Sequence, residues 1–231
     1  MEDQRTSGGA GASTASPPVF PKWTNALPTV VLVLLIVSGG LVTFIVWYYF
    51  SPWYTDVGYQ PKQVVPYSHK LHAGELGLDC RYCHTGVERS AVAGVPPAQT
   101  CMNCHTVVKY DSKKLQLVRD SYKNGTPIPW RRVHKIPEYA YFDHSAHVTR
   151  GVGCAECHGR IDQMEVVRQV KPLSMSWCLE CHRDPATHLR PADVPVTKMD
   201  WQPPSYQDTL GPKLIAEHKI SPPTDCSGCH R

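Results

Sequence analysis

The pattern Cys-x-x-Cys-His occurs five times in this chain and uses all ten of its cysteines. A Cys-x-x-Cys pair alone is compatible with a zinc site, a disulfide or a redox dithiol, none of which needs a histidine directly after the second cysteine. Histidine accounts for 12 of the 231 residues, so five chance placements after five pairs would have odds of about one in a few million. The motifs begin at Cys80, Cys101, Cys154, Cys178 and Cys226.

Covalent attachment of c-type haem does require this pattern. The two thiols bond to the haem vinyl groups, and the adjacent imidazole reaches the iron on the proximal face. The sequence therefore predicts five covalently attached haem c groups. The predicted attachment residues are Cys80, Cys83, Cys101, Cys104, Cys154, Cys157, Cys178, Cys181, Cys226 and Cys229, and the predicted proximal ligands are His84, His105, His158, His182 and His230.

Proline and glycine are abundant, with 21 and 16 residues, and few long periodic segments survive between them. Such a loop-rich chain would form a poor core from side chains alone. Haems change this balance, because each is a large apolar plate that the chain can enclose. We therefore predict a loop-rich, mainly α domain packed around its haems. One helix is expected over residues 111–123, with a polar cap at Asp111 or Ser112 and a stop at Asn124-Gly125.

The N-terminal part of the chain changes character at about residue 22. Residues 1–18 are rich in Gly, Ser, Ala and Thr, so we expect residues 1–22 to be a disordered cytoplasmic tail. No charge occurs between Lys22 and Asp56, and the apolar run from about Leu27 to Phe50 is long enough to cross a bilayer as one helix. Tryptophan and tyrosine flank this run, as is typical of membrane interfaces.

Residues 23–55 are interpreted as an uncleaved transmembrane anchor. A cleaved signal peptide is the alternative, but the apolar part is too long for one and no small-x-small site follows it. Haem is attached to such motifs on the outer side of the energy-conserving membrane. We therefore expect a single-pass protein of the cytoplasmic membrane, with its N-terminus inside and residues 56–231 on the periplasmic or outer side.

The formal net charge of +4 does not indicate a nucleic-acid partner. Five haems would add ten negative propionates and five positive ferric cores, which changes the net charge to about −1. The predicted class is thus a membrane-anchored protein without a role in nucleic-acid binding.

The motif starts are separated by 21, 53, 24 and 48 residues, which alternate between short and long. An aromatic-x-His-x-x-His segment precedes each closely spaced pair, at residues 67–72 and 142–147. This is an internal repeat of about 75 residues. We predict one pentahaem domain over residues 56–231. It consists of two dihaem modules, residues 67–110 and 141–185, and a fifth haem within residues 186–231.

The two His-x-x-His pairs supply the predicted distal ligands. Residues i and i+3 of a helical turn project to one side, so one imidazole can reach the adjacent haem and the other a neighbouring haem. The four histidines concerned are His69, His72, His144 and His147.

The distal ligand of the fifth haem is left open. His134 lies between the modules and is the first candidate, while His218 stands 8 residues before Cys226. Met164 and Met175 are possible thioether ligands, although methionine in a haem protein is more often a packing residue. A His/Met haem would have the highest potential of the set.

Haems with two axial side-chain ligands have no open position for a substrate. Mostly bis-histidine haems therefore predict electron transfer rather than catalysis by this chain alone. No nucleophile triad, nucleotide-binding loop or hydrolytic metal motif is visible in the sequence.

Four stretches carry a resemblance to a known family: PYSHKLHAGELGLDCRYCH, PIPWRRVHKIPEYAYFDHSAH, GVGCAECHGRIDQM and PLSMSWCLECHR. Together with the apolar N-terminal helix, they resemble the pentahaem cytochrome c subunit of alternative complex III, the quinol oxidoreductase that replaces the cytochrome bc1 complex in some bacteria. The resemblance runs from about Trp23 to Arg231 and implies a cytochrome c7-like arrangement of two units.

The resemblance also implies partners in a respiratory or photosynthetic electron-transport chain. These are integral membrane quinol-binding subunits, an iron–sulfur protein of molybdopterin-oxidoreductase type, and a monohaem cytochrome c or small copper protein as acceptor. In that family, quinol is oxidised in other subunits and the pentahaem chain carries the electrons onward.

Other classes of haem protein remain open. A membrane-anchored quinol dehydrogenase that feeds a periplasmic reductase also has one N-terminal helix, but usually has four haems. A multihaem nitrite or tetrathionate reductase would need a five-coordinate iron or a proximal lysine, whereas all five motifs here carry histidine. A reaction-centre tetrahaem subunit would use more methionine ligands than this chain offers.

Overall fold

The computed structural model describes residues 20–50 and 55–230. The chain divides into two units, residues 1–48 and 49–231. The tail expected over residues 1–22 lies mostly outside the described residues.

The first unit contains one long helix, α1 (Leu27–Phe50), preceded by the 3₁₀ turn η1 (Lys22–Ala26). None of its residues is buried. Within Lys22–Phe50, an 18-residue window has a mean hydropathy of 2.7, and within the described ranges this is the one helix long and apolar enough to cross a membrane. A helix that is apolar on all sides and uncovered by protein is stable in lipid rather than in water. This fits the expected anchor.

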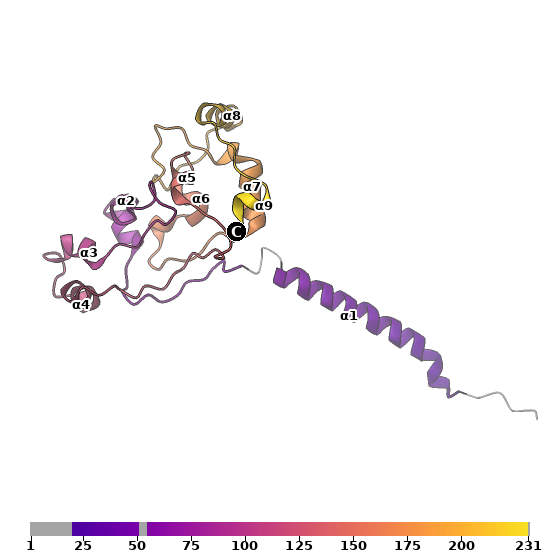
Figure 1. Ribbon diagram of the computed structural model, residues 1–231. Coiled ribbons are helices and arrows are strands. Elements are labelled where there is room, and N and C mark those ends of the chain that lie inside the picture. Colours follow the sequence, from indigo (N-terminus) through magenta and orange to yellow (C-terminus); the bar gives the residue numbers. More distant parts are fainter. Residues whose placement is uncertain (1–19, 51–54, 231) are drawn as a thin grey trace, which may run out of the picture. The chain divides into compact units, whose positions relative to one another are not determined.

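The second unit consists of short helices joined by long loops (Figure 1). No strand forms among residues 55–230, where two isolated bridges pair Ala140 with His230 and Val152 with Leu189. The mainly helical, loop-rich architecture is as predicted. The elements are η3 (Lys70–Glu75), α2 (Cys80–Cys83), α3 (Ala98–His105), η4 (Lys113–Leu115), α4 (Gln116–Asn124), α5 (His144–Val148), α6 (Cys154–His158), η5 (Ile161–Gln163), α7 (Met175–Arg183), η6 (Pro185–His188), α8 (Gln207–His218) and α9 (Cys226–Cys229).

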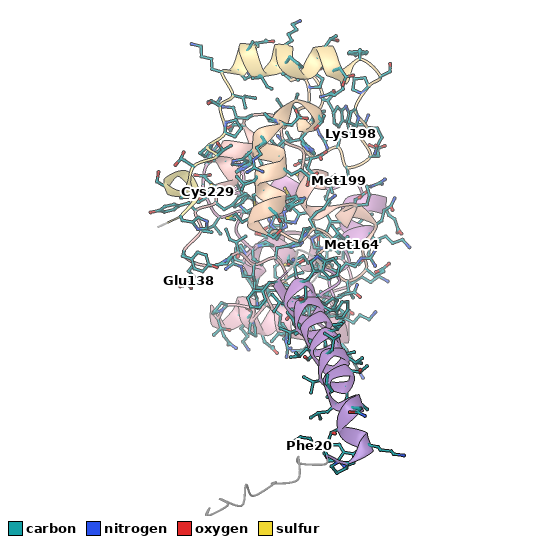
Figure 2. The ribbon with its side chains drawn as sticks, turned by 90° about the vertical axis from the view of Figure 1, so that its right-hand side faces the viewer. Phe20, Glu138, Met164, Lys198, Met199 and Cys229 are labelled. Carbon is teal, nitrogen blue, oxygen red and sulfur yellow. The ribbon has the colours of Figure 1, made fainter. Side chains whose placement is uncertain are left out.

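Helices α3 and α4 lie on one side of this unit, α7, α8 and α9 lie on the other, and α2, α5 and α6 lie between them (Figure 1). The largest apolar cluster is small and joins α3 to α4. Its members are Val65, Ala98, Met102, Val118 and Ile128. Figure 2 shows Cys229 and Glu138 on one flank, which agrees with the bridge between Ala140 and His230. Of the haem-motif helices, α3 alone contributes residues to this cluster, so side-chain packing in the cluster does not hold the other four.

The helix expected over residues 111–123 begins later than predicted. The α4 helix starts at Gln116, and the 3₁₀ turn η4 precedes it. Its end is as expected, because Gly125 takes a left-handed φ of 65° at the C-terminal cap. Val118 on α4 is 1% exposed and packs in the cluster beside α3, so tertiary packing supports this element.

Candidate haem sites

Each Cys-x-x-Cys pair lies on a single helical turn or at the end of a helix. The pairs occupy α2, α3, α6, α7 and α9. Asp79 and Asp225 begin two of these turns, and their carboxylates accept hydrogen bonds from the backbone N–H groups of Arg81 and Gly228. Cysteines three residues apart on a helical turn lie on one face, so both thiols of a pair can reach one macrocycle.

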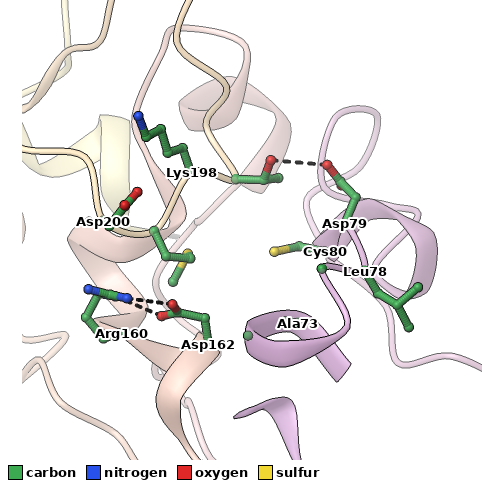
Figure 3. A pocket seen from close by; sticks show the side chains of 12 residues that line it. Ala73, Leu78, Asp79, Cys80, Arg160, Asp162, Lys198 and Asp200 are labelled. Carbon is green, nitrogen blue, oxygen red and sulfur yellow. Dashed lines mark hydrogen bonds and ion pairs between the residues drawn. The ribbon is translucent and has the colours of Figure 1, made fainter. Parts of the chain in front are cut away.

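None of the ten cysteines, all of which lie within residues 55–230, forms a disulfide. Within the described ranges there is no group of three or more His, Cys, Asp or Glu side chains arranged to hold a metal ion, as a structural zinc site would require. The Cys80 side chain points into a cavity of about 340 Å³ (Figure 3). Asp79, hydrogen-bonded to Thr197, and Arg160, paired with Asp162, lie at its edges. The Cys80 thiol therefore faces open space.

The structure brings each of the four expected distal histidines opposite a motif histidine. Two imidazole nitrogens bonded to one metal ion at about 2 Å each hold the ring centres about 6.3 Å apart. The observed separations and interplanar angles are 6.4 Å and 5° for His69–His84, 6.2 Å and 64° for His72–His105, 6.5 Å and 7° for His144–His158, and 6.0 Å and 35° for His147–His182. The four gaps fit one haem iron each.

The ring nitrogens of these histidines are disposed for coordination. In six of the eight rings, Nδ1 lies 2.7–2.8 Å from a backbone carbonyl oxygen to which it can donate. A hydrogen bond at Nδ1 fixes the tautomer, leaves the Nε2 lone pair for the iron and raises the basicity of the ligand. The acceptors are the carbonyls of Ser68, Gly94, Val108, Ala91, Asp143 and Pro223, for His72, His84, His105, His144, His147 and His182 respectively.

The protonation of the buried rings fits the same use. Burial lowers the pKa of His69 to about 4, and the neighbouring His84 and His72 add to the effect. Burial likewise lowers the pKa of His158 to about 3 and depresses the pKa of His147. These imidazoles are therefore neutral at neutral pH, which is the form that binds a metal ion.

The aromatic residue of each repeat positions both histidines that follow it. Tyr67 contacts His69 edge-on at 4.8 Å and 85° and contacts His72 nearly parallel at 4.4 Å and 23°. Phe142 repeats this geometry, at 4.7 Å and 84° to His144 and at 4.8 Å and 26° to His147. The sequence repeat includes these aromatic positions, but their role became visible only in the structure.

The two modules hold each other's distal segments in corresponding ways. The N–H of Ser145, next to His144, donates to the carbonyl of Ser90, six residues after His84. The N–H of Lys70, next to His69, donates to the carbonyl of Met164, six residues after the third motif histidine. Each predicted module therefore helps to position an expected distal histidine of the other.

His134 occupies a different position from the four distal histidines. Its ring lies 4.4 Å from that of His158 at 84°, and its Nε2 is 3.4 Å from the Nδ1 of His158. This places His134 behind a motif histidine, whereas a distal ligand lies across a gap of about 6.3 Å. The position favours a hydrogen bond to His158 over coordination of a fifth iron.

The fifth motif lacks an equivalent pair. Among residues 55–230, no imidazole lies opposite His230 at an iron-bridging distance, while the ring of Tyr139 lies 5.8 Å from that of His230. His218 ends α8, Met175 begins α7 and is 64% exposed, and Met164 is partly buried beside the first module. The distal ligand of the fifth haem therefore stays open among His218, Met164 and Met175.

Residues 140–231 match the protein family described as cytochrome c7 and related cytochrome c. This segment is thus cytochrome c7-like, and it contains three of the five motifs; that family implies covalently bound c-type haem. The haem number across the whole chain rests on the motifs themselves.

Over 100 residues, the chain is 32% identical to a protein of Nitratidesulfovibrio vulgaris strain Hildenborough described as the multiheme cytochrome c subunit of menaquinone reductase. The match covers 43% of this chain and 47% of the relative, so the chain spans about half the length of that protein.

Proposed function

We propose that this chain is a membrane-anchored electron-transfer subunit that carries five covalent c-type haems and exchanges electrons between a quinone-reactive membrane complex and an outer-side carrier. The observation that carries the proposal is the set of four imidazole pairs at 6.0–6.5 Å. An iron held between two imidazoles has no open position, which suits electron transfer and not substrate chemistry.

The thiol neighbours support a linear order of the haems. Burial raises the pKa of Cys83, with Cys101 the first of its charged neighbours, and burial raises the pKa of Cys178, with Cys229 as its neighbour. Burial also raises the pKa of Cys157 to about 12, and Cys181 adds to this. We infer from these neighbours that the first haem is attached next to the second, the third next to the fourth, and the fourth next to the fifth.

The remaining link joins the two modules. The thiols of Cys80 and Cys154 interact with each other, which lowers the pKa of Cys80 to about 7 and raises the pKa of Cys154. The first and third haems would therefore be attached beside one another. The resulting order of haems along the relay is second, first, third, fourth and fifth.

The proposed setting is alternative complex III. The apolar helix α1 would anchor the chain among integral quinol-binding subunits, with an iron–sulfur protein as electron donor and a monohaem cytochrome c or small copper protein as acceptor. The orientation, with residues 56–231 outside, belongs to this proposal.

A second candidate differs in the direction of electron flow. The similarity to a subunit described as belonging to a menaquinone reductase favours a relay that delivers electrons to quinone. If electrons instead flow from quinol outward, a membrane-anchored quinol dehydrogenase that feeds a periplasmic reductase is the alternative to alternative complex III.

The test is a native gel of mildly solubilised membranes, stained for haem, with the proteins of the stained band identified by mass spectrometry. The proposal expects a large assembly with polytopic quinone-binding proteins and an iron–sulfur protein. A stained band holding this chain alone, or with a soluble reductase, contradicts it. The direction of electron flow is then tested by adding either quinol or a reduced outer-side carrier to the solubilised complex. The physiological donor is the one that reduces the haems rapidly.

A further inference from the structure

Arg190 is a buried arginine that none of the predicted haem ligands explains. Its side chain is 2% exposed. Nη1 donates to the backbone carbonyls of Pro195 and Lys198 at 3.2 and 2.7 Å, and the guanidinium carbon lies 4.8 Å from the ring centre of Trp201. The other donors, Nε and Nη2, are buried and have no hydrogen-bond partner among the residues that the structure describes.

The position of the guanidinium is fixed by the segment that joins two haem ligands. The N–H of Arg190 donates to the carbonyl of Gly151, and Val152 pairs with Leu189. A Cβ on Gly153 would lie 2.0 Å from the guanidinium carbon, so only glycine leaves room for it here. This segment runs from the distal histidine of the fourth haem to the first cysteine of the third motif.

The nearby carboxylates do not take up the free donors. Glu156 accepts from the Nδ1 of His188 at 3.1 Å, and Asp200 makes no hydrogen bond to Arg190. Burial lowers the pKa of Arg190, while the charges of Glu156 and Asp200 oppose this shift. A buried guanidinium is stable when a carboxylate accepts hydrogen bonds from its free N–H groups. Neither Glu156 nor Asp200 does so for Nε and Nη2 of Arg190.

We propose that Arg190 binds a haem propionate, with Nε and Nη2 forming the two-pronged contact that a carboxylate accepts. The inference rests on the proposed attachment of haem to this chain. Nε and one terminal nitrogen of arginine match the two oxygens of a carboxylate, which lysine cannot do. The haem concerned is the third or the fourth, since Arg190 touches the segment that serves both.

The contact has a consequence for electron transfer. A buried cation that neutralises a propionate offsets a negative charge that would otherwise stabilise ferric iron. Arg190 therefore holds the potential of its haem above the value that the bare propionate would give.

The test uses the full chain with haem attached, purified in detergent, and four variants. In Arg190→Gln, we expect one haem midpoint to shift to lower potential and one propionate bending band to change in the resonance Raman spectrum. Arg150→Gln is the control, because it removes an exposed arginine directly before the Gly151–Gly153 segment that Arg190 contacts. Unchanged bands and midpoints in Arg190→Gln at full haem content would overturn the proposal.

If Arg190→Gln does not take up all its haem, it is replaced in the test by Arg190→Lys, which keeps the positive charge. A changed propionate band in that variant supports the contact, and an unchanged band contradicts it. Gly153→Ala should reproduce the band change by displacing the guanidinium. The haem count of the unmodified chain tests the proposed function separately, so each claim can fail without the other.

Discussion

Single imidazoles decide the chemistry of this chain, and the distal ones can be tested one at a time. His144→Ala removes the ring opposite His158. The iron then has an open sixth position, so one haem becomes high-spin and the reduced protein binds one additional equivalent of carbon monoxide. His188→Gln is the control, since His188 pairs with Glu156 and lies opposite no motif histidine. An unchanged carbon monoxide stoichiometry in His144→Ala contradicts the assignment.

A substitution at His134 distinguishes two roles for this residue, hydrogen-bond partner of His158 and axial ligand of a haem iron. If it accepts a hydrogen bond from His158, as the 3.4 Å contact indicates, His134→Leu leaves the coordination number of every haem unchanged. One midpoint rises, because a less basic proximal ligand stabilises ferric iron less. A gain of one carbon monoxide equivalent would show instead that His134 is an axial ligand, as the sequence first suggested.

Residues next to one another in sequence were easier to interpret than residues that meet through the fold. The Cys-x-x-Cys-His pattern carries its chemistry locally, and the His-x-x-His pairs needed only the repeat. The side-on contact of His134 could not be predicted, because 24 residues separate it from His158. Arg190 gave no sequence signal, since its burial depends on the fold around Gly153.

The close approach of η3 to η5 joins the two predicted modules. A Cβ on Gly74 would lie 2.3 Å from the carbonyl oxygen of Asp162. Gly74→Ala should therefore destabilise the haem domain by about 1–3 kcal/mol, the usual cost of overpacking. Thermal unfolding followed by haem absorbance measures it as a lower midpoint temperature.

The matched control for that variant lies at the same boundary. Glu165→Gln removes an exposed ion pair with Lys70 at 3.9 Å, and such pairs contribute little to stability. A Gly74→Ala protein that unfolds at the temperature of Glu165→Gln would show that the close approach is not needed.

The helices themselves were predictable in kind more than in extent. The glycine stop after Asn124 was visible in the sequence, whereas the start of α4 was not, because a 3₁₀ turn replaced the expected first turn. His69 caps a π-helix over Lys70–Glu75 that contains His72. The i, i+3 spacing of the two histidines does not distinguish a π-helix from an α-helix.

For the whole molecule, the proposed haem order makes the third haem the link between modules. Replacing Cys154 and Cys157 by serine removes that haem. In the membrane complex, electrons from the physiological donor should then reduce the haems on one side of the gap only. Replacing Cys226 and Cys229 removes a terminal haem and leaves the other four in one uninterrupted row, so these four should be reduced together or not at all, according to the end at which electrons enter. Full reduction of all remaining haems at the normal rate without the third haem contradicts the order.

The central claim is that one chain carries five covalent haems, and the intact mass of the protein isolated from its native membranes tests it most directly. The account predicts a mass that exceeds the polypeptide mass by five haem groups, with no thiol left for alkylation. A mass with fewer haems, or with alkylatable cysteines in any motif, would contradict the relay as proposed.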